Sequence, residues 1–137
     1  ALVSTWWTGT LLKKAFRRFF RKAVGSEAQF NVLMVLASTE EDLNQNDLSN
    51  RLLIDKSNVT GLIDRMEDQD LVRRNTVPGD RRSYHITLTP KGKELVEQVQ
   101  GPYIEKVHQA MEGFTAEERK ELTRLTSKLR ATLAELI

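Results

Sequence analysis

An arginine-rich stretch stands out in the middle of the chain. Four arginines fall within ten residues, on either side of the turn-forming run Val77-Pro78-Gly79-Asp80: Arg73, Arg74, Arg81 and Arg82. A guanidinium group forms paired hydrogen bonds to phosphate, and an arginine at a hairpin tip enters a narrow minor groove, where the negative potential of DNA is concentrated. The spacing therefore indicates contact with nucleic acid.

The residues around these arginines are typical of a β-hairpin. Segments 71–76 and 83–88 are rich in strand-forming residues, and the run between them has turn chemistry. Alternation along the second segment predicts that every other side chain faces the core: Tyr84, Ile86 and Leu88. Asp80 is the only acid among the arginines, so we expect a dense basic patch on this hairpin.

The helix expected before the hairpin has one apolar and one polar face. Its apolar residues recur at i, i+3, i+4 and i+7: Val59, Leu62, Ile63 and Met66. The other side presents short polar side chains with cations at its edges: Lys56, Ser57, Asn58, Thr60, Gly61, Asp64 and Arg65. We expect Asp55 to cap this helix, and a short helix over 45–53, capped by Asn44, to precede it. Two such helices followed by a basic hairpin predict a winged helix-turn-helix.

Residues 1–26 carry six bases and no acid: Lys13, Lys14, Arg17, Arg18, Arg21 and Lys22. Helical spacing places an apolar face opposite them: Leu12, Ala15, Phe16, Phe19, Phe20 and Ala23. We favour a helix that packs on the fold or on a second subunit, because it runs directly into a helix capped by Ser26, with Gln29 reaching back. A membrane-surface helix and a transit peptide stay open. Because the chain begins at Ala1, the completeness of the N-terminus also stays open.

The last third of the chain predicts two further helices. Thr89 caps the first, which has Pro90 in its first turn, runs to about Gly113 and should kink at Gly101-Pro102. Thr115 and the glutamates after it form a capping box for the second. Leucines recur along that second helix at spacings of three and four, as in a core or a subunit interface: Leu122, Leu125, Leu129, Leu133 and Leu136.

Length and composition narrow the classes of protein. A chain of 137 residues with 39% hydrophobic side chains fits one domain with a core. No apolar run approaches the roughly 20 residues that span a bilayer, so we expect a soluble protein of the cytoplasm with no membrane partner. There is no cysteine, and the two histidines have no helical partner that would complete a metal site. No phosphate loop or nucleophile motif is present, so we expect no enzyme, metal or cofactor.

The net charge of +2 hides three unlike segments. Residues 1–26 carry +6, residues 27–89 carry −4 and residues 90–137 are neutral. The presumed DNA-binding middle is therefore acidic overall, and binding there must depend on where the arginines lie. We expect weak non-specific DNA binding and strong dependence on the hairpin.

Three stretches resemble the MarR family of bacterial and archaeal transcriptional regulators: SEAQFNVLMVL, DLSNRLLIDKSNVTGLIDRMEDQDLVRR and DRRSYHITLTPKGKEL, over residues 26–95. The Asp80-Arg81-Arg82 turn followed by LTPKG is the most specific part. The resemblance implies a winged-helix homodimer with intertwined terminal helices. It also implies binding to double-stranded, pseudo-palindromic operator DNA, commonly as a repressor released by a small phenolic or aromatic effector.

The same resemblance implies roles for single residues. The recognition-helix positions contact bases and phosphates, namely Lys56, Ser57, Asn58, Thr60, Gly61 and Arg65. Arg82 matches the arginine that enters the minor groove, and Asp80 the acid that pairs with it. Arg73, Arg74 and Arg81 are phosphate contacts or hairpin salt bridges. Many relatives carry an arginine at the position of Gly61, and Asp64 opposes phosphates unless a neighbour such as Arg65 neutralises it.

We thus predict a mostly α-helical winged helix-turn-helix protein with a small β-hairpin wing. Residues 1–25 form an N-terminal dimerisation helix, 26–89 the DNA-binding domain and 90–137 the C-terminal dimerisation helices. A helical protein-interaction or membrane-surface module that uses the cationic first helix is the alternative. Without cysteine, a thiol-oxidation switch is excluded, which leaves ligand binding as the expected trigger.

Overall fold

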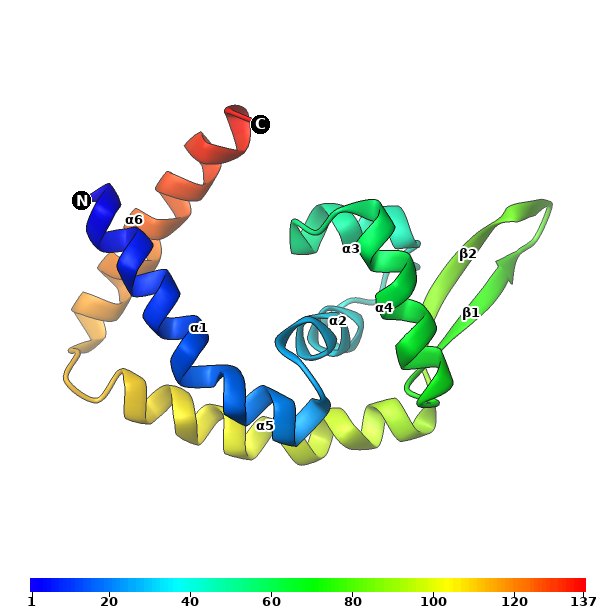
Figure 1. Cartoon of the computed structure of the whole chain (residues 1–137), viewed down its shortest axis with the longest axis horizontal. Coiled ribbons are helices and arrows are strands. Elements are labelled where there is room, and N and C mark those ends of the chain that lie inside the picture. Colours follow the sequence, from blue (N-terminus) through cyan, green and yellow to red (C-terminus); the bar gives the residue numbers. More distant parts are fainter. The chain divides into compact units, whose positions relative to one another are not determined.

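The computed structural model describes all residues from 1 to 137, as six helices and one antiparallel hairpin (Figure 1). The predicted fold class is confirmed. The chain forms two compact units, Ala1–Gln100 and Gly101–Ile137, and the division falls inside a helix. The elements are α1 (Leu2–Val24), α2 (Glu27–Ser38), α3 (Gln45–Leu52), α4 (Lys56–Asp68), β1 (Val72–Val77), β2 (Asp80–Leu88), α5 (Pro90–Ala110) and α6 (Ala116–Glu135).

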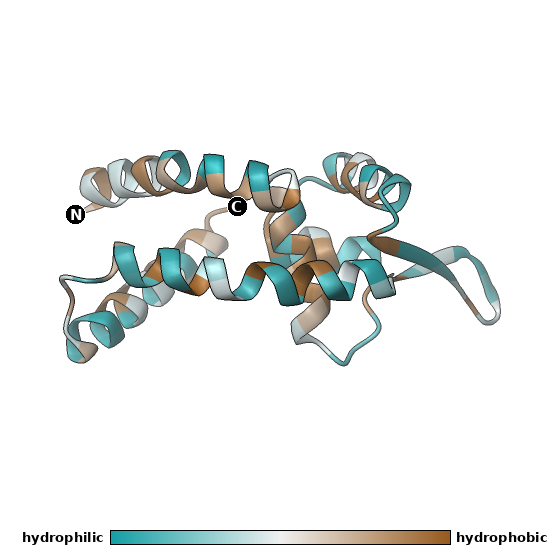
Figure 2. Ribbon diagram, turned by 90° about the horizontal axis from the view of Figure 1, so that it is seen from below, coloured by the Kyte–Doolittle hydropathy of each residue, from teal (hydrophilic) through white to brown (hydrophobic).

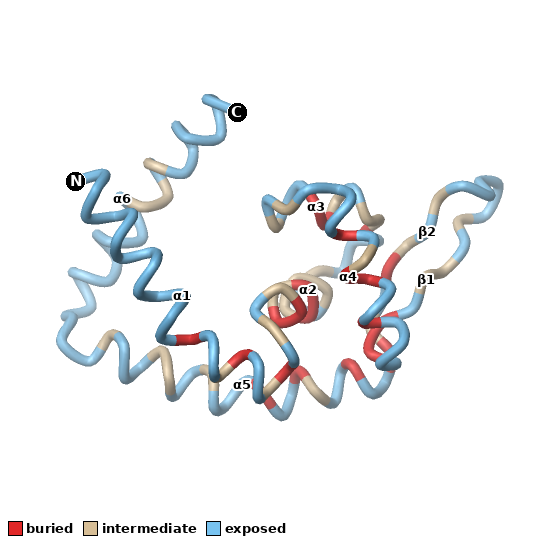
Figure 3. The backbone as a smooth tube through the Cα atoms, viewed as in Figure 1, coloured by how far each residue is buried: buried red, intermediate tan, exposed pale blue.

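The core of the first unit forms where α2, α3 and α4 meet the base of the hairpin (Figure 3). The apolar face predicted for α4 is buried, since its four members are at most 3% exposed. From α2, Val32 and Leu33 fill the centre, and Leu48 of α3 packs with them. Burying side chains of this size stabilises the unit by about 1.5–3 kcal/mol each. The opposite face of α4 is therefore left to solvent.

Capping explains where the helices of this unit begin. Ser26 Oγ accepts a hydrogen bond from the Gln29 N–H at 3.1 Å, as predicted. The Gln29 side chain does not reach back, because it is folded against Gly25 and only 5% exposed. Asn44 caps α3 in a reciprocal box with Asp47. Asp55 is the N-cap residue of α4, as predicted, but it contributes only its backbone carbonyl and makes no side-chain cap bond.

The hairpin has an irregular tip. Strand pairing is regular from Val72↔Leu88 to Thr76↔Tyr84, and Val77 then pairs with Asp80, so residues 81–83 bulge from β2. Ile86 is buried, but Tyr84 is 41% exposed, because the strands extend past the core before they reach it. Tyr84 lies on the same face of β2 as Ile86, as predicted, but the burial expected for it is wrong.

The stretch LTPKG joins the hairpin to α5. Thr89 Oγ1 donates to the carbonyl of Asp70 at 2.5 Å and accepts from the Gly92 N–H at 3.0 Å. A Cβ on Gly92 would collide with the carbonyl oxygen of Leu71, so only glycine permits this approach. Asp70 itself has φ of 59°, the left-handed conformation that Asp tolerates better than most residues. These bonds fix the beginning of α5 to the base of the wing.

Helix α1 packs on α2 through the end of its aromatic face. Phe16 and Phe20 are each 8% exposed, and the Phe20 and Phe30 ring centres lie 4.6 Å apart. Leu12 is 55% exposed, so the N-terminal half of the predicted apolar face is not covered by the rest of the first unit. The same holds for Trp6 and Trp7, which are 78% and 68% exposed.

The second unit contains the end of α5 and all of α6. Helix α5 runs without interruption through Pro102 and ends at Ala110, three residues before the predicted Gly113. Helix α6 begins with the predicted Thr115 capping box and has no buried residue. Most of its leucines are exposed, including Leu125 at 49% and Leu133 at 45%, and Leu129 is half-buried. No helix in the chain is both long enough and apolar enough to cross a bilayer.

Candidate nucleic-acid interface

The polar face of α4 is accessible along its length. Lys56, Ser57, Asn58, Thr60 and Arg65 are exposed. A side chain at Gly61 would meet only the guanidinium of Arg65, at 3.6 Å. The structure therefore has room for a larger residue at this position, but glycine offers no side chain that could contact DNA. A helix with short polar side chains on one exposed face has the shape and chemistry to enter a major groove.

The Asp80 carboxylate organises the tip of the wing. Its Oδ1 accepts from the backbone N–H of Arg82 at 2.9 Å, and its Oδ2 accepts from the Ser83 hydroxyl at 2.7 Å. These two hydrogen bonds stabilise the charged carboxylate and hold the pKa of Asp80 below its ordinary range, and the bond from the Arg82 N–H has the larger effect. The expected pairing of Asp80 with the Arg82 guanidinium is therefore replaced by a bond to the Arg82 backbone. That guanidinium stays exposed on the bulge, as does Arg81.

Arg74 behaves differently from the other wing arginines. Its guanidinium lies 2.7 Å from Asp64 Oδ1 and 3.1 Å from Glu67 Oε1, and its side chain is only 18% exposed. Glu67 Oε2 also accepts from the Arg74 backbone N–H at 3.0 Å. Arg74 therefore ties β1 to α4, which favours the salt-bridge alternative over a phosphate contact. Arg73, next to it, is exposed.

Gln45 extends this connection to α3. Its Oε1 accepts from Arg74 Nε at 3.0 Å, and its Nε2 donates to Thr60 Oγ1 at 3.1 Å. Sequence reasoning missed both Gln45 and Glu67. The available signal for Glu67 was its position three residues after Asp64, which puts two carboxylates on neighbouring turns of α4, beside a strand that carries arginines. One network thus joins α3, the recognition helix and the wing.

Asp64 is neutralised by a residue other than the one expected. Its carboxylate pairs with Arg74, whereas Arg65, its chain neighbour, remains exposed. The negative charge of Asp64 on the exposed face of α4 is therefore neutralised by Arg74 of the wing. The guanidinium of Arg65 stays available to a ligand. No group of three or more potential metal-ligating side chains lies close together.

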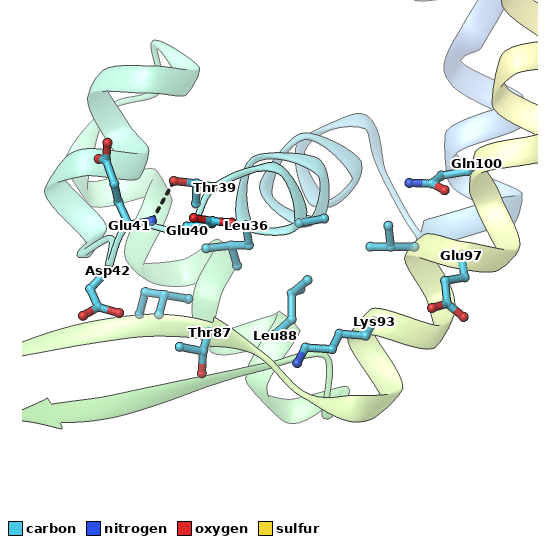
Figure 4. Close-up of a pocket in the computed structure, with 13 residues that line it drawn as sticks. Leu36, Thr39, Glu40, Glu41, Asp42, Thr87, Leu88, Lys93, Glu97 and Gln100 are labelled. Atoms are coloured by element: carbon cyan, nitrogen blue, oxygen red, sulfur yellow. Dashed lines mark hydrogen bonds between the residues drawn. The ribbon is translucent and has the colours of Figure 1, made fainter.

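A crevice of about 610 Å³ lies behind the interface, between the end of α2, β2 and α5 (Figure 4). Its lining includes the apolar residues Leu36, Ala37, Ile86, Leu88 and Val96. Lys93 and Glu97 project into the same space from α5 (Figure 4). The remaining lining residues are polar or acidic: Thr39, Glu40, Glu41, Asp42, Thr87 and Gln100. Five apolar residues beside convergent polar groups could hold a small molecule, although eight of the thirteen lining residues are polar or charged and most small-molecule sites are mainly apolar.

A helix-turn-helix with an exposed polar second helix, locked to an arginine-tipped hairpin, defines a winged-helix DNA-binding protein. The MarR family model matches residues 26–83. The chain is 32% identical to the homoprotocatechuate degradative operon repressor of Escherichia coli, over 80% of this chain and 74% of that protein. It is 29% identical to the transcriptional regulator PecS of Dickeya dadantii, over 87% of this chain and 73% of PecS. The chain belongs to the MarR family of transcriptional regulators.

Solved structures agree with this assignment. A MarR/EmrR family regulator from Acinetobacter sp. ADP1 has a TM-score of 0.87 at 26% identity, covering 98% of this chain and 95% of that one. NadR in complex with 4-hydroxyphenylacetate has a TM-score of 0.77 at 25% identity, covering 93% and 89%. The chain is thus a DNA-binding transcriptional regulator of a dimeric family, which is a family of regulators and not of enzymes.

Proposed function

We propose that this protein is a homodimeric repressor without enzymatic activity, which acts in the cytoplasm on pseudo-palindromic operators and is released by a small aromatic effector. The observation that carries the proposal is the exposed polar face of α4, tied by the Arg74–Asp64 ion pair to a wing whose Arg73, Arg81 and Arg82 are also exposed. The E. coli relative is itself named as an operon repressor. A two-fold dimer would present two such surfaces to successive turns of DNA, about 34–36 Å apart.

The contacts divide by chemistry. Ser57, Asn58 and Thr60 reach base edges in the major groove, while Lys56 and Arg65 bind phosphates at the edges of α4. Gly61 leaves room for the base pair beneath it. From the wing, Arg82 enters the minor groove and the nearby arginines bind phosphates: Arg73 and Arg81. Arg74 positions the wing from within the network and does not itself contact DNA.

The remaining helices supply the dimer. Residues 1–25 and 90–137 form the dimerisation region and residues 26–89 the DNA-binding domain. Support comes from the apolar side chains that have no partner within one chain, at the N-terminal end of α1 and along α6. Large apolar surfaces of this kind mark subunit interfaces. An intertwined dimer would bury them and set the distance between the two recognition helices.

The effector would bind in the crevice between α2, β2 and α5. A ligand there contacts both the base of the wing, through Ile86, and a helix of the dimerisation region, through Val96. It can therefore bias the orientation of the wing. NadR was solved with 4-hydroxyphenylacetate, a phenol of a size suited to such a crevice. In this chain the crevice carries four carboxylates and a single ammonium, from Lys93, and only the Glu41 carboxylate is paired with an arginine, Arg51 at 3.0 Å. The remaining excess of acids favours a neutral or cationic aromatic over an anion.

A selection experiment tests the proposed function. The full chain is incubated with a pool of random-sequence duplexes, and the bound DNA is amplified and sequenced over several rounds. We expect enrichment of an inverted repeat whose half-sites lie one helical turn apart. Failure to enrich any sequence, or enrichment of a single half-site bound by a monomer, would contradict the proposal.

A further inference from the structure

Three bases spaced four residues apart form a line along α1: Lys13, Arg17 and Arg21, which we call the basic row. All three are exposed, and the ion pairs of the structure involve other residues. Together they line a hollow of about 370 Å³ beside the beginning of α2. Glu27 is the only acid that borders it, so the hollow is strongly positive.

The basic row continues towards the recognition helix. Lys13 also lines a second hollow of about 420 Å³, whose other walls include Asn58 and Arg65 of α4. The two hollows share Lys13, Glu27 and Ala28, so they adjoin within the first compact unit, and Lys13 connects the row to the edge of the recognition helix. Alternating hydrophilic bands along α1 mark the polar side of this helix (Figure 2).

We propose that the basic row of α1 is a second DNA-backbone contact, which binds phosphates next to those held by Arg65. The inference rests on the proposed function, since it places the row on the same duplex. The charge distribution supports DNA as the occupant. The segment 27–89 carries −4 in spite of the cations of α4 and the wing, so its overall charge opposes approach to a polyanion, whereas residues 1–26 carry +6.

The helix itself offers a matched control. Lys14, Arg18 and Lys22 are spaced in the same way, are also exposed, and lie about 100° around the helix from the basic row. They line neither hollow. Replacing either set by glutamine removes three charges from α1, so long-range electrostatics change equally in the two variants. Only loss of local contacts distinguishes them.

The test measures DNA affinity of the full-length parent and of both triple variants, at several salt concentrations. The probes are a duplex enriched by the parent from random sequence and a scrambled duplex of equal length. We expect the K13Q/R17Q/R21Q variant to lose at least about ten-fold in affinity, with a salt slope reduced by about 0.9 for each phosphate contact removed. Because phosphate contacts carry no sequence information, its preference for the enriched duplex should not change.

The K14Q/R18Q/K22Q control should keep a salt slope closer to that of the parent. Equal losses in the two variants, or no loss in the first, would overturn the proposal. If the K13Q/R17Q/R21Q variant loses binding to phosphatidylglycerol vesicles but binds DNA as the parent does, the proposal is also overturned and the row is assigned to a lipid surface. If the parent binds no duplex selectively, the proposed function fails. The proposal for the basic row is then tested on the scrambled duplex alone. It stands only if the K13Q/R17Q/R21Q variant loses more affinity for that duplex than the K14Q/R18Q/K22Q control.

Discussion

Arg74 and Asp64 form an ion pair of 2.7 Å that connects the wing to the recognition helix. The pair resolves one feature that conflicts with DNA binding when the sequence is considered alone, and it assigns a role to one arginine of the cluster. It offsets a carboxylate on the face of α4 that approaches phosphates, and it gives one of four clustered arginines a structural task. Helix α4 therefore orients the wing, and we propose that the two elements bind DNA together.

Removing this arginine should destabilise the first unit. We expect Arg74→Ala to lower the free energy of unfolding by about 1.5–3 kcal/mol, because hydrogen bonds to charged groups are lost and two carboxylates are left without their cation. Arg74→Lys should not restore stability, since an ammonium cannot reproduce the fork that bonds both acids. Urea denaturation gives the values. Arg73→Ala, at the exposed neighbouring position, is the control and should change stability by less than about 0.5 kcal/mol.

The order of the wing tip should depend on pH only in acid. The pKa of Asp80 is lowered in the folded protein, so its bonds stabilise the tip above the unfolded-state pKa of about 3.8 and are lost as pH falls through the lower folded value. NMR titration should give an Asp80 midpoint below 3.8. The amide resonances of Arg82 and Ser83 should shift with that midpoint and be displaced at all pH values in Asp80→Asn. A midpoint at or above the ordinary value would show that these bonds do not form in solution.

Ligand binding in the crevice should depend on the volume of the crevice and on the charge of the ligand. Ala37→Trp fills the space and should abolish binding of a phenolic effector, whereas Ser38→Trp, at an exposed position outside the lining, should not. We expect 4-hydroxyphenylacetamide to bind more tightly than 4-hydroxyphenylacetate, because the carboxylates of the crevice repel the anion. Calorimetry measures both affinities. Tighter binding of the anion would show that Lys93 dominates the charge of the crevice. If the Ala37→Trp variant binds the effector as tightly as the parent, the effector site lies elsewhere.

Dimerisation should depend on the leucines of α6. Leu125→Lys places a charge on that apolar face, and we expect it to convert the dimer into a monomer, because the desolvation of an unpaired ammonium is costly. Ala131→Lys introduces the same group on the opposite side of the helix and should leave the dimer intact. Sedimentation velocity distinguishes the chain mass of 15.7 kDa from its double. A dimer that survives Leu125→Lys would exclude this face from the interface.

Short-range patterns accounted for most of the fold. The spacing of apolar residues in α4 predicted its buried face, and the turn residues and arginines predicted the hairpin, because these signals depend on neighbours within a few residues. The exposed position of Tyr84 was missed, since alternation does not reveal where a strand leaves the core. The side-chain bond expected from the Asp55 cap does not form, because a suitable residue type does not ensure the rotamer that makes the bond.

Long-range polar contacts could not be inferred from the sequence. The hydrogen bond between Arg74 and Gln45 joins residues 29 positions apart, and nothing in the chain order indicates that these two meet. The same limit applies to Gly92, whose necessity becomes apparent only when its backbone lies against Leu71. The roles assigned to the DNA-contacting residues remain predictions.

The wing arginine offers the most direct test of the account. Parent, Arg82→Ala and Arg81→Ala are titrated against the enriched duplex and against a version in which the base pairs under the wing are changed from A·T to G·C, which widens the minor groove. The account predicts that the parent prefers the A·T duplex. Arg82→Ala should lose about 1–3 kcal/mol of binding free energy together with that preference. Arg81→Ala should weaken both duplexes equally. An Arg82→Ala variant that binds as tightly as the parent, with the same preference, would contradict the account.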